Sequence, residues 1–187
     1  MQKLELFQVE GIHTLRSFRF FTGLRELHII CQGHMTRISG LEGCPQLQAL
    51  WIQQCKIQRI EGLQSCKQLH TLHLTNNHIS RIEGLQELTE LQVLWLNENR
   101  ISSLHGLSKN VKLRSLWIAK NKIEKIGTAL DSLVSVVMLR QRPFAPLYLY
   151  LYSNLYLHLE LLPQPYRRPI FRSSTSPTIS SDPSRKS

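Results

Sequence analysis

The residues that could bind a metal or perform catalysis follow no spacing that such chemistry requires. The chain of 187 residues has eight histidines and four cysteines. His70 and His73 are three residues apart, and in a strand this spacing points two side chains to opposite faces, which does not suit chelation. The sequence contains no nucleophile elbow and no glycine-rich phosphate loop. We therefore predict that the chain is not an enzyme and has no metal site, no cofactor and no small-molecule substrate.

A repeat of 22 residues organises the middle of the chain. Its regular copies open at Leu47, Leu69, Leu91 and Leu113. Each copy begins with leucine, two variable residues, leucine, one variable residue, and leucine or isoleucine, and a less regular copy opens at Leu24. We expect three regions: an N-terminal cap or degenerate repeat (1–23), about five repeats (24–134) and a basic, low-complexity tail (135–187) that is largely disordered.

The repeat positions, counted from each opening leucine, predict local structure. The leucine at position four and the aliphatic residue at position six alternate with variable residues, which is typical of a short strand with one buried face. Position nine holds Cys55, Asn77, Asn99 and Asn121. An asparagine offers both an acceptor and two donors, so it can satisfy backbone groups where the chain turns into the core. Glycine at position sixteen suits a crowded backbone on the return path.

The phrase Asn-His-Ile-Ser-Arg-Ile-Glu-Gly-Leu at residues 77–85 and the shared frame resemble the 22-residue class of leucine-rich repeat, similar to the regulatory-subunit type of protein phosphatase 1. The resemblance implies an α/β leucine-rich-repeat solenoid, with a curved parallel sheet on the concave side and short 3-10 or helical turns on the convex side. It also implies a protein-interaction scaffold, with a phosphatase complex or a cilium as settings by analogy. Two departures are Cys55 in place of asparagine and a failed sixth copy with Arg140 where an aliphatic residue belongs.

Position five of the repeat carries an unusual set of side chains. In stacked strands, one repeat position forms a row with a spacing of about 4.8 Å. This row holds His28, Trp51, His73, Trp95 and Trp117, and so every tryptophan of the chain. We predict that it binds a partner protein on the concave face, together with Asn97 and Glu98 and with Trp95 and Trp117 as the anchors. The alternative is a cross-strand ladder in which the rings only cover one another.

The cysteines and the start of the chain bear on the cellular compartment. Cys44 and Cys66 occupy the apolar position twenty and Cys55 occupies position nine, so packing explains three of the four. The sequence has no Asn-x-Ser/Thr motif, no cysteine-rich cap and no signal-like start. We expect an intracellular protein, in the cytoplasm, with the cilium or the nucleus as alternatives.

The tail is basic, with 7 Lys/Arg against 2 Asp/Glu in residues 136–187. It offers an alternative function, which is binding of nucleic acid or an anionic membrane, although a solvated charge excess is the commoner explanation of such a sequence. Leucine and tyrosine nearly alternate over residues 147–159, which permits a strand but equally fits low-complexity sequence appended to an interrupted array, as in a truncated or alternative form. Because Asn154, His158 and Glu160 interrupt this stretch, we expect no transmembrane segment.

Overall fold

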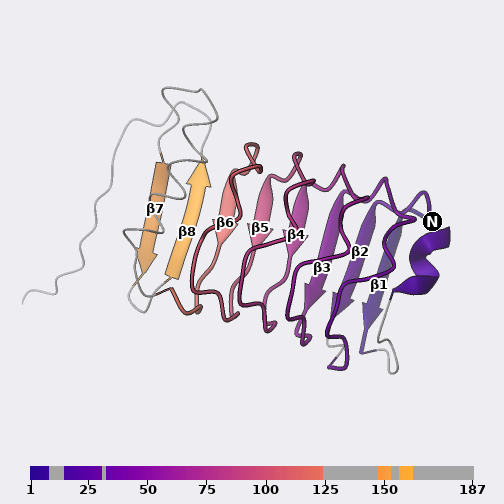
Figure 1. The fold of residues 1–187 in the computed structure, drawn as a ribbon, viewed down its shortest axis with the longest axis horizontal. Coiled ribbons are helices and arrows are strands. Elements are labelled where there is room, and N and C mark those ends of the chain that lie inside the picture. The colour runs from indigo at the N-terminus through magenta and orange to yellow at the C-terminus, as the bar shows by residue number, and fades with distance from the viewer. Residues whose placement is uncertain (9–14, 31–32, 124–146, 153–155, 162–187) are drawn as a thin grey trace, which may run out of the picture.

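The computed structural model describes residues 1–8, 15–30, 33–123, 147–152 and 156–161. These residues form an eight-stranded sheet and a short 3-10 helix (Figure 1). The strands are β1 (Lys3–Phe7), β2 (Glu26–Ile30), β3 (Ala49–Gln53), β4 (Thr71–His73), β5 (Val93–Trp95), β6 (Ser115–Trp117), β7 (Leu147–Tyr152) and β8 (Tyr156–Leu161). The 3-10 helix is η1 (Arg16–Phe20). Most of the tail, and with it the expectation of disorder there, lies outside the described residues.

The first six strands form a parallel sheet in chain order, and the described parts of the return paths pass across the same side of it (Figure 1). Equivalent repeat positions lie opposite one another, as in the pairs Leu50↔Leu72 and Leu72↔Leu94. The arrangement is a β-solenoid with little helix, so the predicted fold class is confirmed. The chain has this form because each 22-residue unit can bury its apolar side only against its neighbours.

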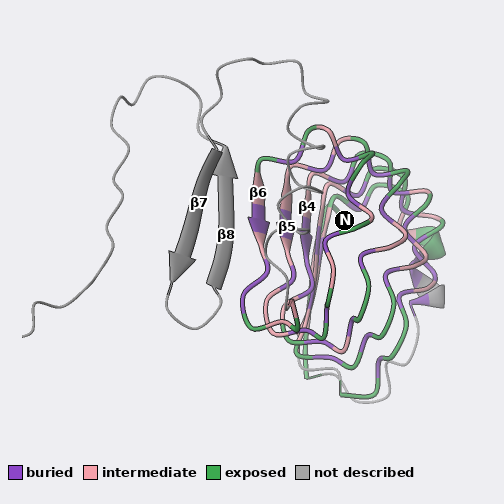
Figure 2. Cartoon of the chain, turned by 60° about the vertical axis from the view of Figure 1, so that its left-hand side comes forward, coloured by how far each residue is buried: buried purple, intermediate pink, exposed green. Residues whose placement is uncertain are grey.

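The core lies between the sheet and the return paths. The residues at positions four and six, such as Leu94 and Leu96, are fully buried, whereas Val93 and Trp95 are only half-buried. Figure 2 shows the same alternation along the solenoid as buried and intermediate stretches. On the return path, Gly84 has a φ of 72°, and a Cβ atom there would collide with the carbonyl oxygen of Ile60 in the preceding turn. Gly62 and Gly106 meet the equivalent carbonyl one turn before and one turn after, so these three turns require glycine at position sixteen.

The position-nine asparagines satisfy the backbone in the way the sequence predicts. The Oδ1 atom of Asn99 accepts a hydrogen bond from the Ile79 N–H at 3.0 Å. Its Nδ2 atom donates to the carbonyls of Leu74 at 2.9 Å and Leu96 at 3.1 Å. Asn77 and Asn121 repeat this pattern one turn before and one turn after. The asparagines thus join each turn to the preceding one.

Position twenty is buried and apolar at Cys44, Cys66 and Leu88, as the sequence suggested, but polar in the turn of Asn110. Asn110 is fully buried there, and its Nδ2 atom donates to the carbonyls of Leu85 and Leu88, both at 2.9 Å. Two cysteines at the same position also make polar contacts, because the Sγ atom of Cys44 lies 3.3 Å from the Phe18 carbonyl and that of Cys66 lies 3.8 Å from the Leu41 carbonyl. In these three turns, position twenty therefore supplies a hydrogen-bond donor to the preceding turn.

The two ends of the sheet are built differently. At the N-terminal end, β1 continues the parallel sheet beyond β2, and η1 lies at that end (Figure 1). At the other end, β8 pairs antiparallel with β6, with Trp117 opposite His158, and β7 pairs antiparallel with β8. The alternation in residues 147–159 thus corresponds to two strands. No helix among the described residues is long and apolar enough to cross a membrane.

Candidate interaction surface

The structure places the position-five residues in one row on the face of the sheet opposite the core. The pairing registers join His28 to Trp51, Trp51 to His73, His73 to Trp95 and Trp95 to Trp117. We call these five residues the aromatic row. His73 is 7% exposed and the other four are half-buried, and none of the five belongs to the hydrophobic core.

Neighbouring rings of the aromatic row touch in three of its four pairs. The ring centroids are 4.0 Å apart for His28 and Trp51, 4.2 Å for His73 and Trp95, and 5.6 Å for Trp95 and Trp117. These tilted and edge-on contacts are geometries that aromatic pairs favour. Mutual covering, the alternative to binding, therefore occurs, but it leaves the three indoles partly open to solvent.

Two polar atoms in the row are buried without a partner. His73 is held on both sides, by Gln53 Nε2 at 3.3 Å and Thr75 Oγ1 at 2.8 Å, and Trp117 donates to Ser115 Oγ at 3.0 Å. By contrast, the Nε1 atom of Trp95 and the Nε2 atom of His28 have no hydrogen-bond partner. Such groups cost stability, and the row therefore contains a buried indole N–H that lacks an acceptor.

Both histidines of the row are neutral at pH 7. Burial and, to a smaller extent, the nearby His28 lower the pKa of His73 from 6.5 to about 4. Burial also lowers the pKa of His28, and the positive charge of Lys3 adds to that effect. If Gln53 Nε2 donates to the Nδ1 atom of His73, the Nε2–H of His73 donates to Thr75. The row therefore carries no net charge of its own.

Charge divides the outward face into two parts. The N-terminal strands carry Lys3, Glu5 and Glu26, with Lys3 Nζ lying 2.9 Å from the Glu5 carboxylate and 3.8 Å from that of Glu26. Outward positions three, five and seven of the next four turns hold no Asp, Glu, Lys or Arg. These residues are Ala49, Trp51, Gln53, Thr71, His73, Thr75, Val93, Trp95, Asn97, Ser115, Trp117 and Ala119. We call these twelve residues the uncharged patch.

Asn97 and Glu98, the two polar residues predicted to bind the partner, both interact with other residues of the chain. The Oδ1 atom of Asn97 accepts a hydrogen bond from the Ala119 N–H at 2.8 Å, and the carboxylate of Glu98 lies 2.7 Å from Lys120 Nζ. Sequence reasoning missed Gln53, Thr75 and Ser115, which bond to the rings of the row. These residues lie at positions three and seven of the repeat, on the same face as position five, and this placement could have identified them from the sequence.

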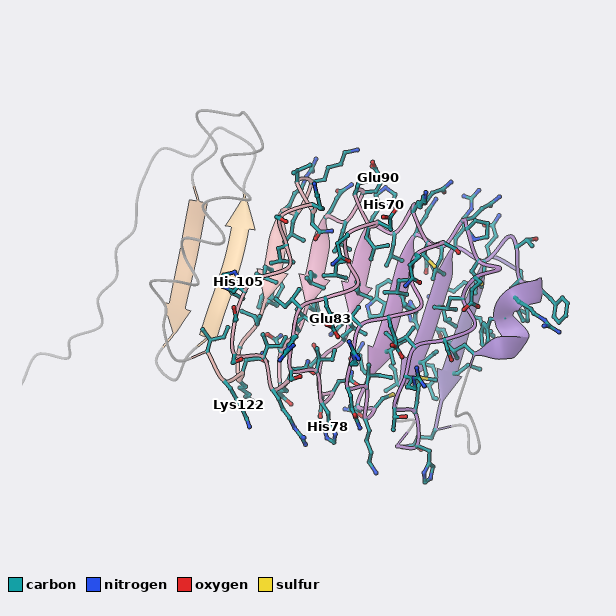
Figure 3. All side chains as sticks on the ribbon, in the orientation of Figure 1. His70, His78, Glu83, Glu90, His105 and Lys122 are labelled. Atoms are coloured by element: carbon teal, nitrogen blue, oxygen red, sulfur yellow. The ribbon has the colours of Figure 1, made fainter. Side chains whose placement is uncertain are left out.

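The other charged pairs lie away from the aromatic row. Glu83 accepts from Arg59 at 2.7 Å on the return-path side, and Glu90 pairs with Lys112 at 2.6 Å at one end of the strands. The labels in Figure 3 show Glu83 over the return paths and Glu90 near that rim. These exposed pairs provide sites for control substitutions that leave the row intact.

Other reactive side chains form no site among the described residues. No group of three or more His, Cys, Asp or Glu lies close enough to hold a metal ion in this part of the chain. Burial raises the pKa of the Cys66 thiol to about 12, and burial also raises that of Cys44. Because the thiolate is the reactive form of cysteine, both thiols are poor nucleophiles.

Comparisons with known proteins identify the repeat. A family model described as leucine-rich repeats (2 copies) matches residues 45–87 and 89–132. No curated protein matches the sequence. Among solved structures, the chain is similar to two internalins of Listeria monocytogenes, inlF and inlC2, and to a leucine-rich-repeat protein of Leptospira interrogans.

The structural similarity lies in the fold. Sequence identities are 24%, 22% and 19%, and TM-scores are 0.58, 0.59 and 0.63 in the same order. The matches cover 72%, 68% and 77% of this chain but only 39%, 56% and 37% of the respective structures. Residues 45–87 and 89–132 therefore match leucine-rich repeats, and the solved structures share the solenoid fold.

Proposed function

We propose that the chain is a protein-interaction module that binds a segment of a partner protein across the uncharged patch, on the concave side of the solenoid. Leucine-rich-repeat folds are commonly protein-interaction modules. The observation that carries the proposal is the row of touching rings centred on Trp95, half-buried on the face opposite the core.

The packing of the row favours binding because it fixes the indoles in advance. Trp95 contacts His73 on one side and Trp117 on the other, and Trp117 also bonds to Ser115. A side chain that is already held loses little conformational entropy when a partner covers it. Tryptophan is also enriched among residues that dominate binding energy. Trp95 and Trp117 are thus the anchors of the proposed site.

The patch also limits the chemistry of the partner. A charged partner side chain buried against it would meet no charge of opposite sign, which is costly. The preferred partner is therefore an uncharged segment rich in apolar side chains.

We also propose a class for the repeats and a cellular location for the chain. The spacing of 22 residues between Leu47, Leu69, Leu91 and Leu113 supports assignment to the 22-residue class of leucine-rich repeat. The free thiols of Cys44, Cys55 and Cys66 are compatible with a reducing, intracellular location. We propose no catalytic role.

Selection from a phage-displayed library of random peptides, with the full chain as target, tests the proposal. We expect peptides of uncharged, apolar composition whose Kd rises at least about 30-fold in the Trp95→Ala/Trp117→Ala double variant, since two hot-spot residues are lost. The Arg59→Ala/Glu83→Ala variant, which changes the opposite side, should bind like the wild type. Circular dichroism checks that both variants are folded, and equal affinity of a folded double variant for the selected peptides would contradict the proposal.

A further inference from the structure

The outer edge of β1 carries hydrogen-bonding groups that no described strand uses. β1 is the terminal strand of the sheet and pairs only with β2 (Figure 1). The Gln2 carbonyl accepts from the Glu26 N–H at 2.9 Å, and the Gln8 N–H donates to the Ile30 carbonyl at 3.1 Å. Bonds to one neighbouring strand come from alternate residues. The backbone groups of the odd-numbered residues 3, 5 and 7 therefore point away from β2.

The side chains along this edge are unusually open for a strand of the solenoid. Leu4 and Leu6 are only half-buried, whereas the equivalent residues of β2, Leu27 and Ile29, are fully buried. On the outward face, Phe7 is 55% exposed, and Met1, just before the strand, is 73% exposed. An open strand edge beside exposed apolar side chains is a template for pairing with another strand.

We propose that two copies of the chain pair through β1, antiparallel, with Leu4 opposite Leu4 of the second copy. This homodimer interface is separate from the proposed partner-binding patch. The occupant is a second copy because the order of charges in β1, Lys3 followed by Glu5, is complementary to itself when the strand is reversed.

Charge selects the register of the pairing. Only the odd-numbered residues present backbone groups at the open edge, so each must lie opposite another odd-numbered residue. With Leu4 on the two-fold axis, Lys3 lies opposite Glu5 of the second copy, and Glu5 lies opposite its Lys3. A shift of the second copy by two residues in either direction places Lys3 opposite Lys3 or Glu5 opposite Glu5. Opposite charges across an antiparallel pair stabilise it and like charges destabilise it.

The same register also covers the open apolar side chains. Lys3 and Glu5 are already 2.9 Å apart within one chain, so the two copies form a square of four charges that alternate in sign. On the core side, Leu4 lies against Leu4 of the second copy. On the outward side, Met1 comes opposite Phe7 of the second copy, which brings together two of the most exposed apolar side chains. Backbone bonds, charge and apolar contact therefore favour one geometry.

Sedimentation equilibrium of the full chain over a concentration series, up to about 100 µM, tests the pairing with charge variants. We expect a monomer–dimer equilibrium for the wild type. Lys3→Glu creates two Glu–Glu contacts and Glu5→Lys creates two Lys–Lys contacts, so each variant alone should raise the dimer Kd about tenfold. Lys112→Glu makes the same change of net charge far from β1 and should leave the Kd unchanged.

An equimolar mixture of the two β1 variants separates a lost interface from a lost fold. In a mixed dimer, every contact again joins a glutamate to a lysine, so the mixture should dimerise about as tightly as the wild type. A variant that had merely unfolded β1 would not recover in this way. A wild type that stays monomeric throughout, single variants that keep the wild-type Kd, or a mixture no tighter than its components would each overturn the proposal.

Discussion

The two faces of the same sheet carry different kinds of residues. Leu94 and Trp95 are neighbours in β5, yet Leu94 is fully buried in the core and Trp95 is half-buried on the outward face. On the inward face, leucine and isoleucine recur in every regular turn. On the outward face, positions three, five and seven of the repeat hold aromatic, small aliphatic, hydroxyl-bearing and amide side chains. The repeat therefore fixes the inward face for stability and leaves the outward face to vary, and the proposed binding site lies on the face that varies.

Two asparagines in one turn give the sharpest test of this difference. Asn99 faces inward and bonds to buried backbone groups of two turns, whereas Asn97 faces outward and accepts one bond from the Ala119 N–H. We expect Asn99→Ala to lower the free energy of unfolding by about 3–4 kcal/mol, because several buried groups lose their partners, and Asn97→Ala by about 1 kcal/mol. Urea denaturation of both variants measures the two losses, and equal losses would remove the distinction between the faces.

Acid affects the outward face through His73. Its pKa is about 4 in the folded chain against an ordinary value of 6.5, so the unfolded chain binds the proton first. The stabilising contribution of the neutral ring is therefore present above pH 6.5 and is lost as the pH falls from 6.5 to 4. We expect this loss to be about 2 kcal/mol, below the full value of such a shift because the row is partly solvated.

The His73 effect is measured as a difference between two proteins. Urea denaturation at several pH values between 7.5 and 4, for the wild type and for His73→Gln, cancels the contribution of the carboxylates that both share. The wild type should lose more stability than the variant over this range. Parallel pH profiles would show that His73 does not titrate abnormally.

The exposed ion pairs should have the smallest effect. Glu83 and Arg59 are 2.7 Å apart on the return-path side, where solvent screens them. Glu83→Gln should change the free energy of unfolding by no more than about 0.5 kcal/mol. A thermal melt in low and high salt checks this expectation, and a loss above about 2 kcal/mol would mean that the return paths contribute more than surface charge.

Much of the inward face could be predicted from the sequence because each inward position recurs every 22 residues. The frame predicted the strands, the buried aliphatic residues and the bonding of Asn77, Asn99 and Asn121, since a buried amide needs backbone partners. It did not predict Asn110, because the neighbouring copies offered cysteine or leucine at position twenty. It also gave no sign of the positive φ angles at position eight, near 55° for Gln54, Asn76, Glu98 and Lys120.

The outward face could be predicted only in outline. Stacking of equal repeats places one position in a row, so the order from His28 to Trp117 followed from the frame. The ring contacts and the unpartnered Nε1 atom of Trp95 depend on side-chain rotation, which no spacing encodes. The pairing of β8 with β6 was also beyond prediction, because alternation indicates a strand but names neither its partner nor its direction.

Fluorescence of the wild-type chain is the most direct measurement of where a partner binds, because all three tryptophans lie in the aromatic row. Acrylamide quenching is measured before and after saturation with a peptide from the displayed library, and calorimetry establishes saturation independently. A partner seated on the row should shield the indoles and lower the quenching constant clearly. Saturated binding with unchanged quenching would place the peptide elsewhere and contradict an interaction site on the aromatic row.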